Sequence, residues 1–273
     1  MVKKSILISL LLSIALVVNS QSLCKKLKSA YRDKSEEKLE DILNEWNNLK
    51  FEVPSNDTSE LIGEVIKYFY FPNSLNEYDS IEDKYVVIKP KIEIKFFETL
   101  NLDTVNYIES YSNDTVNLLK IKEEQGKERY ERYRSSFYSA LSMDKDYKKI
   151  ELYVADSPYK VLYLTDSIRN NLEKFLGNKK VPFARWNIMS PARSKGKSGR
   201  RQEFLNKYLQ VIYGHWGNYW HLEAQPFVYR IAIDDNFETA VLFFQKGYQG
   251  GYAKYLKKES EWKLDFFEFT WIE

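Results

Sequence analysis

The sequence FVYRIAID at residues 227–234 indicates a β-sheet, because apolar side chains recur in it at every second position. One parity carries Phe227, Tyr229, Ile231 and Ile233. A period of two is typical of a strand that buries one face. The polar run Asp234-Asp235-Asn236 follows and favours a turn, because short polar side chains bond to their own backbone. This stretch therefore predicts the first strand of an antiparallel meander.

The meander is expected to continue to the end of the chain. Residues 240–257 are rich in strand-forming residues but contain Gly247 and Gly250-Gly251, which favour a bulge or bend. We expect one long bent strand here; the alternative is two strands joined by a hairpin at Gly250-Gly251. After a polar turn at 257–261, a final strand is expected, with one face formed by Trp262, Leu264 and Phe266.

Immediately before the meander lies the aromatic sequence YGHWGNYWH at residues 213–221. Its two glycines allow sharp backbone turns, and its rings offer large stiff faces with polar tips. These properties predict a ligand site at the open end of the folded sheet, for a small molecule, glycan or peptide. The candidate residues are Tyr213, His215, Trp216, Tyr219, Trp220 and His221. The alternative is a hydrophobic plug, which is the favoured interpretation for Trp216.

The C-terminal part of the chain also resembles a known group. The matching stretches are Val161–Thr165, Phe175-Leu176-Gly177, Gly214–Gly217 with Tyr219-Trp220, Gly250-Gly251 and Thr270–Glu273. They are similar to a group of uncharacterised secreted bacterial proteins with an NTF2-like (cystatin-like α+β roll) domain. The similarity covers roughly residues 159–273 and implies a roll with a bent antiparallel sheet. We therefore expect an α+β fold with this roll at 151–273, preceded by a helical N-terminal region with a few strands at 21–150. The resemblance carries no assigned chemistry, because this superfold hosts enzymes and binding proteins alike.

The N-terminus has the pattern of an export signal. Lys3 and Lys4 precede an apolar run at residues 6–18, and a small residue, Ser20, follows. We expect residues 1–20 to be removed and the protein to be periplasmic or secreted. The run is shorter than the ~20 residues of a membrane-spanning helix, and no other stretch is long enough. Lipid attachment at Cys24 is disfavoured, because bulky Leu23 precedes it where acylation needs a small residue.

Charge and cysteine content narrow the class of protein. Without Lys3 and Lys4, 39 basic side chains face 39 acidic ones, so no overall field attracts nucleic acid or an anionic membrane. The single cysteine excludes an intrachain disulfide, so stability must come from packing.

Periodicity predicts several further elements. Residues 25–50 and 58–69 are expected to form a helical hairpin, the first helix burying Leu39, Ile42, Leu43, Trp46 and Leu49. Strands are predicted at 85–97, with a kink or edge at Pro90, at 149–153 and at 159–164. A further strand is expected at 106–112, and helices at 118–143, 167–176 and 202–212. Thr165 or Asp166 is expected to cap the helix at 167–176, and Gly177 to end it.

A basic segment at residues 191–202 is predicted to be an exposed loop. It carries Arg193, Lys195, Lys197, Arg200 and Arg201. The sequence Gly196-Lys197-Ser198 is similar to the end of a phosphate loop, but the first glycine of that motif is replaced by Pro191. An anion-binding role for this loop remains the alternative to simple solvation.

Residues that would support catalysis or metal binding are sparse. His215 and His221 are six positions apart, and no third ligand lies at metal-site spacing, so we expect no metal and no cofactor.

No nucleophile stands beside a base, and four carboxylates flank the meander: Glu223, Asp234, Glu268 and Glu273. One of them could act as a general base in the roll, and Glu268 could instead pair with Arg230. We therefore expect a non-catalytic binding protein, with a hydrolase or isomerase in the same cavity as the alternative and a structural or partner-binding envelope protein as a third possibility.

Overall fold

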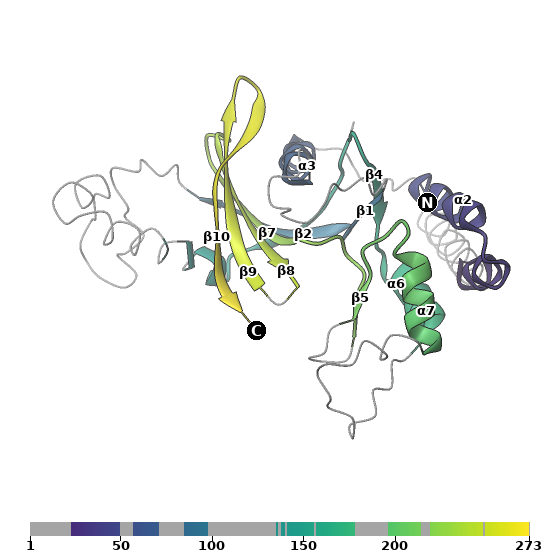
Figure 1. The fold of residues 1–273 in the computed structure, drawn as a ribbon. Coiled ribbons are helices and arrows are strands. Elements are labelled where there is room, and N and C mark those ends of the chain that lie inside the picture. The colour runs from purple at the N-terminus through teal and green to yellow at the C-terminus, as the bar shows by residue number, and fades with distance from the viewer. Residues whose placement is uncertain are drawn as a thin grey trace, which may run out of the picture. The chain divides into compact units, whose positions relative to one another are not determined.

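The computed structural model describes a mixed α+β protein with a mostly antiparallel sheet. The described residues are 23–49, 57–70, 85–97, 135, 138–139, 141–155, 157–177, 196–213, 219–247 and 249–272. They belong to two compact units whose segments alternate along the chain (Figure 1). The first unit comprises Met1–Glu52, Tyr78–Pro90 and Ser157–Ala224, and the second comprises Val53–Glu77, Lys91–Asp156 and Gln225–Glu273. The sequence pattern predicts instead a single boundary near residue 150.

The helices of the first unit enclose its hydrophobic core. They are a helix at residues 23–33, α2 (Glu36–Asn47), α6 (Asp166–Leu176) and α7 (Lys197–Leu205). The predicted helix at 25–50 is divided in two, because Lys34 adopts a left-handed φ of 51° and the Ser35 side chain then caps α2. Most of its predicted apolar face is buried, but Leu49 is exposed.

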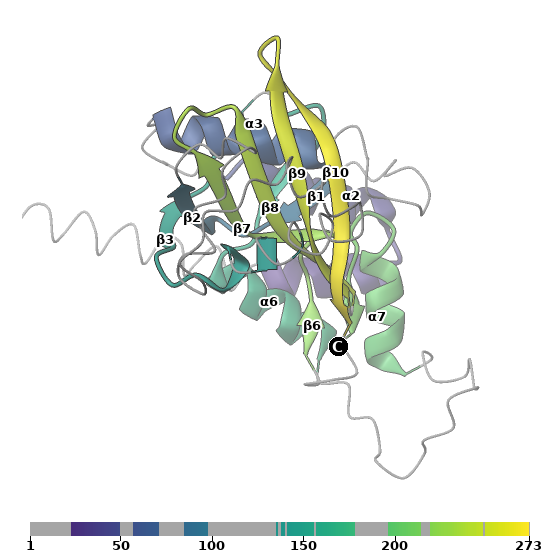
Figure 2. The same ribbon diagram turned by 90° about the vertical axis from the view of Figure 1, so that its left-hand side faces the viewer.

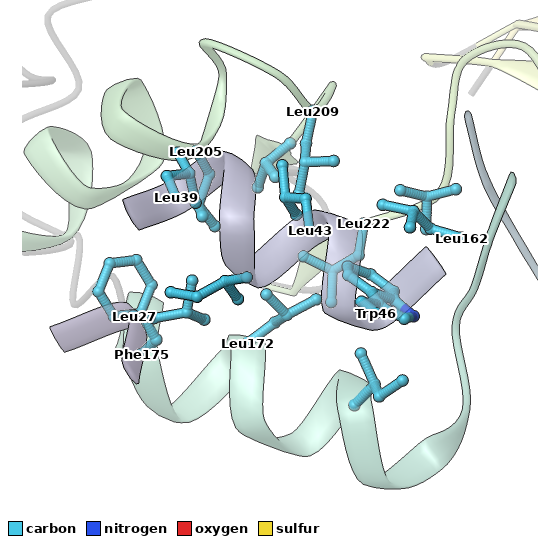
Figure 3. Close-up of a cluster of buried hydrophobic side chains, with 14 of the residues drawn as sticks. Leu27, Leu39, Leu43, Trp46, Leu162, Leu172, Phe175, Leu205, Leu209 and Leu222 are labelled. Carbon is cyan, nitrogen blue, oxygen red and sulfur yellow. The ribbon is translucent and has the colours of Figure 1, made fainter. Parts of the chain in front are cut away.

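The core of the first unit is visible in Figure 3. Leu39, Leu43 and Trp46 project from α2 toward Leu172 of α6 and Leu205 at the end of α7. The core also packs against two short parallel strands, β1 (Tyr85–Ile88) and β4 (Lys160–Tyr163). Trp46 Nε1 donates a hydrogen bond to the Tyr163 carbonyl at 3.0 Å, which fixes α2 to the end of β4.

Both predicted caps of α6 are confirmed. The Thr165 side chain accepts a hydrogen bond from the Ile168 N–H, and Gly177 ends the helix with a φ of 77°. By contrast, the helix predicted at 202–212 is wrong, because α7 starts at Lys197 and ends at Leu205. The Asn206 side chain bonds to both backbone groups of Val211, at 2.8 and 3.1 Å, and so closes a loop where the helix would have continued.

The second unit is built on a sheet in which six strands are described. They are β2 (Lys91–Phe97), β3 (Lys148–Glu151), β7 (Phe227–Asp234), β8 (Thr239–Lys246), β9 (Gln249–Lys258) and β10 (Glu261–Ile272). The order is β10-β9-β8-β7-β2-β3, and the four C-terminal strands form the predicted antiparallel meander (Figure 2). β2 joins it by parallel pairing with β7. The strand predicted at 85–97 is thus two strands, separated at Pro90, as the kink in the prediction implied.

Side chains cover both faces of this sheet. On one face, Phe69 of α3 (Asp57–Tyr70) contacts the rings of Phe244 and Tyr255. On the other, Tyr138 and Leu141 pack against Ala232, Val241, Phe243 and Tyr252; we call this side the Tyr252 face. Burial on two faces explains why residues 231–234 are all buried, although alternation had predicted only one buried face. The two helices of the expected hairpin, α2 and α3, belong to different units.

Two predictions inside the meander are wrong. Residues 239–258 form two strands rather than one bent strand, and the turn lies at Gly247, with a φ of 60°, rather than at Gly250-Gly251. The final strand contains a bulge between Leu264 and Phe266. Leu264 is therefore paired with Tyr255, whereas Phe266 lies on the Tyr252 face, so the two side chains do not share a face as predicted.

Predicted elements at 106–112 and most of 118–143 lie outside the described residues, although residues 138–139 and 141–143 are helical. The short strands predicted at 149–153 and 159–164 are confirmed as β3 and β4. None of the helices in the described ranges is long and apolar enough to cross a membrane.

Candidate functional site

The predicted aromatic site is a short hairpin of the first unit. β5 (Ile212–Tyr213) pairs with β6 (Trp220–His221), so that Tyr213 is opposite Trp220 and Ile212 is opposite His221. The hairpin and the meander belong to different units, so the pairing of strands gives no support for placing it at the open end of the meander's sheet. His215 and Trp216, which lie between the two strands, fall outside the described residues.

One face of this hairpin is structural. Trp220 is buried in the core of the first unit, and its Nε1 donates a hydrogen bond to the Gly177 carbonyl at 3.0 Å. The Tyr213 ring packs against it edge-on, with a centroid distance of 4.7 Å. Burial raises the pKa of the Tyr213 hydroxyl above its ordinary value. These two residues therefore anchor the hairpin.

The other face of the hairpin is turned away from the core. Tyr219 and His221 flank Trp220 in sequence, so the alternation of strand side chains places them on the opposite side. Their rings contact each other, with centroids 4.5 Å apart, and the Tyr219 side chain is half exposed. Ile212, the partner of His221 in the register, is also exposed. The hairpin thus presents a pair of aromatic rings on an anchored support.

The predicted basic loop is in part a helix. Lys197, Arg200 and Arg201 lie in α7, while Arg193 and Lys195 are outside the described part of the chain. Arg201 is packed rather than free: its Nη1 donates to the Phe175 carbonyl, and its guanidinium lies 5.3 Å from the Phe175 ring centroid. Lys197 and Arg200 are exposed on the helix surface.

Three of the four predicted carboxylates are described, and each has partners. Asp234 is buried and accepts hydrogen bonds from the N–H groups of Glu238 and Thr239, both at 2.8 Å, which stabilises the β7–β8 turn. The Glu268 carboxylate accepts a hydrogen bond from the Tyr252 hydroxyl, on the Tyr252 face. The expected Glu268–Arg230 pair is not formed, because Arg230 Nε donates to Glu93 at 2.6 Å. Glu273 is outside the described residues.

Glu223 is the third carboxylate and is held by cations. Its side chain is buried, Arg169 contacts it directly, and Lys89 Nζ lies 3.8 Å from it. Burial by itself would raise the pKa of Glu223, but the charges of Arg169 and Lys89 and a backbone N–H lower it below the ordinary value. A general base that works near neutral pH needs a raised pKa, so Glu223 is unsuited to that role.

An ion pair between a buried lysine and an exposed aspartate of the second unit was not predicted from the sequence. Lys254 lies on the same side of β9 as Tyr252, and its Nζ is 3.0 Å from the Asp265 carboxylate. The signal was hidden because alternation within one strand does not give the register between β9 and β10, which sets this pair.

Within the described ranges, no group of three or more His, Cys, Asp or Glu side chains is placed to hold a metal ion. No family model matches the chain, and neither a curated protein nor a solved structure shows significant similarity to it.

Proposed function

We propose that the protein is an exported, non-catalytic binding protein that contacts its ligand through the outward face of the β5–β6 hairpin. The observation that carries this proposal is the ring pair of exposed Tyr219 and half-buried His221, held on a hairpin whose other face is anchored by Trp220. A stiff support keeps the rings in place before binding, which lowers the conformational entropy lost when a ligand stacks on them. Suitable ligands are a small molecule, a glycan or a peptide with a flat or ring-shaped surface.

We also propose that the second unit is an NTF2-like roll. This assignment is supported by the long antiparallel meander and by the helix α3 packed against one of its faces. Export is supported by the sequence pattern at residues 1–20.

The function is tested by single alanine substitutions, with melting temperature and binding measured across a glycan and metabolite panel. Tyr219→Ala and His221→Ala should leave the melting temperature nearly unchanged and weaken binding about fivefold, since each aromatic contact contributes about 1 kcal/mol. Trp220→Ala is the matched control: it removes a core side chain and should cost about 3–5 kcal/mol of stability. If all three variants lose stability and none changes binding, the hairpin is only core and the proposal is wrong.

A hydrolase or isomerase is the second candidate, and one contact favours it. Glu268 lies beside the aromatic side chains Tyr252 and Phe266, a setting in which a carboxylate could act on a bound ligand. The same panel distinguishes this function from simple binding, because an enzyme converts a panel compound and Glu268→Gln abolishes that conversion without abolishing binding.

A further inference from the structure

We propose that Lys254 is the centre of a binding site for small organic carboxylates on the Tyr252 face of the second unit. The site is independent of the β5–β6 hairpin, which belongs to the first unit. It rests on three observations: the burial of a lysine ammonium, the small number of acceptors around it, and a bulge that places both a carboxylate and an aromatic ring beside it.

Lys254 is buried in the middle of a sheet, which is costly for a charged group. Its side chain is only 8% exposed, and its ammonium lies 5.8 Å from the centroid of the Phe266 ring. An ammonium has three N–H donors. Within the described chain, the acceptor found at ion-pair distance is the Asp265 carboxylate, at 3.0 Å. The cation therefore keeps hydrogen-bonding capacity that a second carboxylate can use.

The bulge in β10 determines which side chains lie beside Lys254. Leu264 pairs with Tyr255 and Phe266 pairs with Lys254, which leaves Asp265 as the extra residue. In a bulge of this kind two consecutive residues oppose one residue of the neighbouring strand, so Asp265 and Phe266 both approach Lys254. In a regular strand Asp265 would still oppose Lys254, but Phe266 would pair with Ala253 and turn to the α3 side. The bulge therefore adds the Phe266 ring to the surroundings of Lys254. Bulges are frequent beside functional sites because they redirect single side chains in this way.

The exposure of Asp265 gives a ligand its route to the cation. The Asp265 side chain is 37% exposed, whereas that of Lys254 is almost fully covered. A rotation of Asp265 into solvent would leave the ammonium facing the outside, and a ligand carboxylate could then take its place. Asp265 thus competes with the ligand carboxylate for the Lys254 ammonium, and it keeps that buried charge paired when no ligand is bound.

The neighbouring side chains select the rest of the ligand. The rings of Tyr138, Tyr252 and Phe266 contact one another, with centroid distances between 4.6 and 6.0 Å. An aromatic ring attached to a carboxylate can lie against the edge of this cluster while its charge meets Lys254. We therefore assign the site to aromatic carboxylates in preference to simple inorganic anions.

Benzoate is the probe for this site, in calorimetric titrations of the full chain. Benzamide, which has the same shape without the charge, and acetate, which lacks the ring, serve as ligand controls. Asp265→Asn removes the tethered competitor and should tighten benzoate binding about tenfold relative to the unmodified protein. Lys254→Met keeps most of the unbranched side chain but removes the cation, and it should abolish benzoate binding.

Two results would overturn the proposal: no benzoate binding by the Asp265→Asn variant, or equal binding of benzoate and benzamide. The first would mean that the pair serves folding alone. Should Lys254→Met fail to fold, the Asp265→Asn variant and the two control ligands still decide the question. Because Tyr219 and His221 variants leave this site intact, failure here is distinguishable from failure of the proposed hairpin site.

Discussion

At the scale of single residues, Glu223 shows how a buried charge can stabilise the fold rather than perform chemistry. It lies in the first unit just after β6, where its carboxylate also accepts the Leu222 N–H at 3.2 Å. The next residue, Ala224, donates to the Val87 carbonyl at 2.9 Å. Arg169 and Lys89, which come from distant parts of the sequence, thus fix the end of the aromatic segment to α6 and to the region just after β1.

Glu223→Gln should therefore destabilise the protein by about 1–3 kcal/mol near pH 7, the usual range for hydrogen bonds to a charged group. The pKa of Glu223 is lowered in the folded state, so its contribution is present above the unfolded-state pKa of about 4.3 and is lost as pH falls through the folded value. Urea unfolding at pH 7 and pH 3 should show the difference between the variants shrinking in acid. Glu173→Gln, which changes a more exposed partner of Arg169, is the control and should cost less than ~1 kcal/mol. A difference that does not depend on pH would contradict this role.

At the scale of elements, the close packing of β9 and β10 depends on Gly251. A Cβ atom added there would lie 2.1 Å from the Glu268 carbonyl oxygen and 3.1 Å from the Phe244 ring. Real Cβ atoms do not approach backbone oxygen so closely, so the two strands must separate. The sequence pattern predicted a bend or turn at Gly250-Gly251. Position 251 requires glycine because there is no space for a Cβ atom between the two strands.

Gly251→Ala should accordingly cost at least about 2 kcal/mol, within the range of overpacked cores. Gly247→Asn is the matched control: Gly247 has a φ of 60° and nothing within 4 Å of its added Cβ, and asparagine tolerates the left-handed conformation. Thermal unfolding of both variants, with hydrogen exchange of β10, checks the expectation. Equal stability of the Gly251→Ala variant and the unmodified protein would show that the strands yield without cost.

The elements that sequence predicted best are those with a local signal. The caps Thr165 and Gly177 and the apolar spacing in α2 involve residues within four positions of one another, so they could be predicted from the sequence. The β10 bulge and the turn at Gly247 were missed because they depend on how neighbouring strands pair. The same reason explains the candidate site: Tyr219 and His221 were named from composition, whereas Trp220 proved to be core and Lys254–Asp265 was not found.

At the scale of the whole molecule, each of the two units is built from three segments, and the segments of the two units alternate along the chain. The second unit takes α3 and the strands β2 and β3 from residues before 157, and the meander from residues after 224. Residues 151–273 therefore contain only part of the sheet of this unit. Periodicity describes one element at a time and carries no information on which distant elements pair, so a single linear boundary was the simplest expectation.

The maturation of the chain can also be argued at this scale. Cys24 lies in the helix at 23–33 and is buried in the core of the first unit, where Leu27 and Ala30 of the same helix are also buried. A diacylglycerol group on its sulfur would have no space in that core. Leu23, directly before it, is also too bulky for the lipid-transfer reaction. We therefore predict that export removes residues 1–20 and leaves Cys24 unmodified.

Intact-mass measurement of the protein from the periplasm or medium of an expressing bacterium should match residues 21–273. A Cys24 variant, Cys24→Ala, should be exported and released to the same extent. A mass that includes a lipid at Cys24, or a full-length chain retained in the cytoplasm, would show that this interpretation of the N-terminus is wrong.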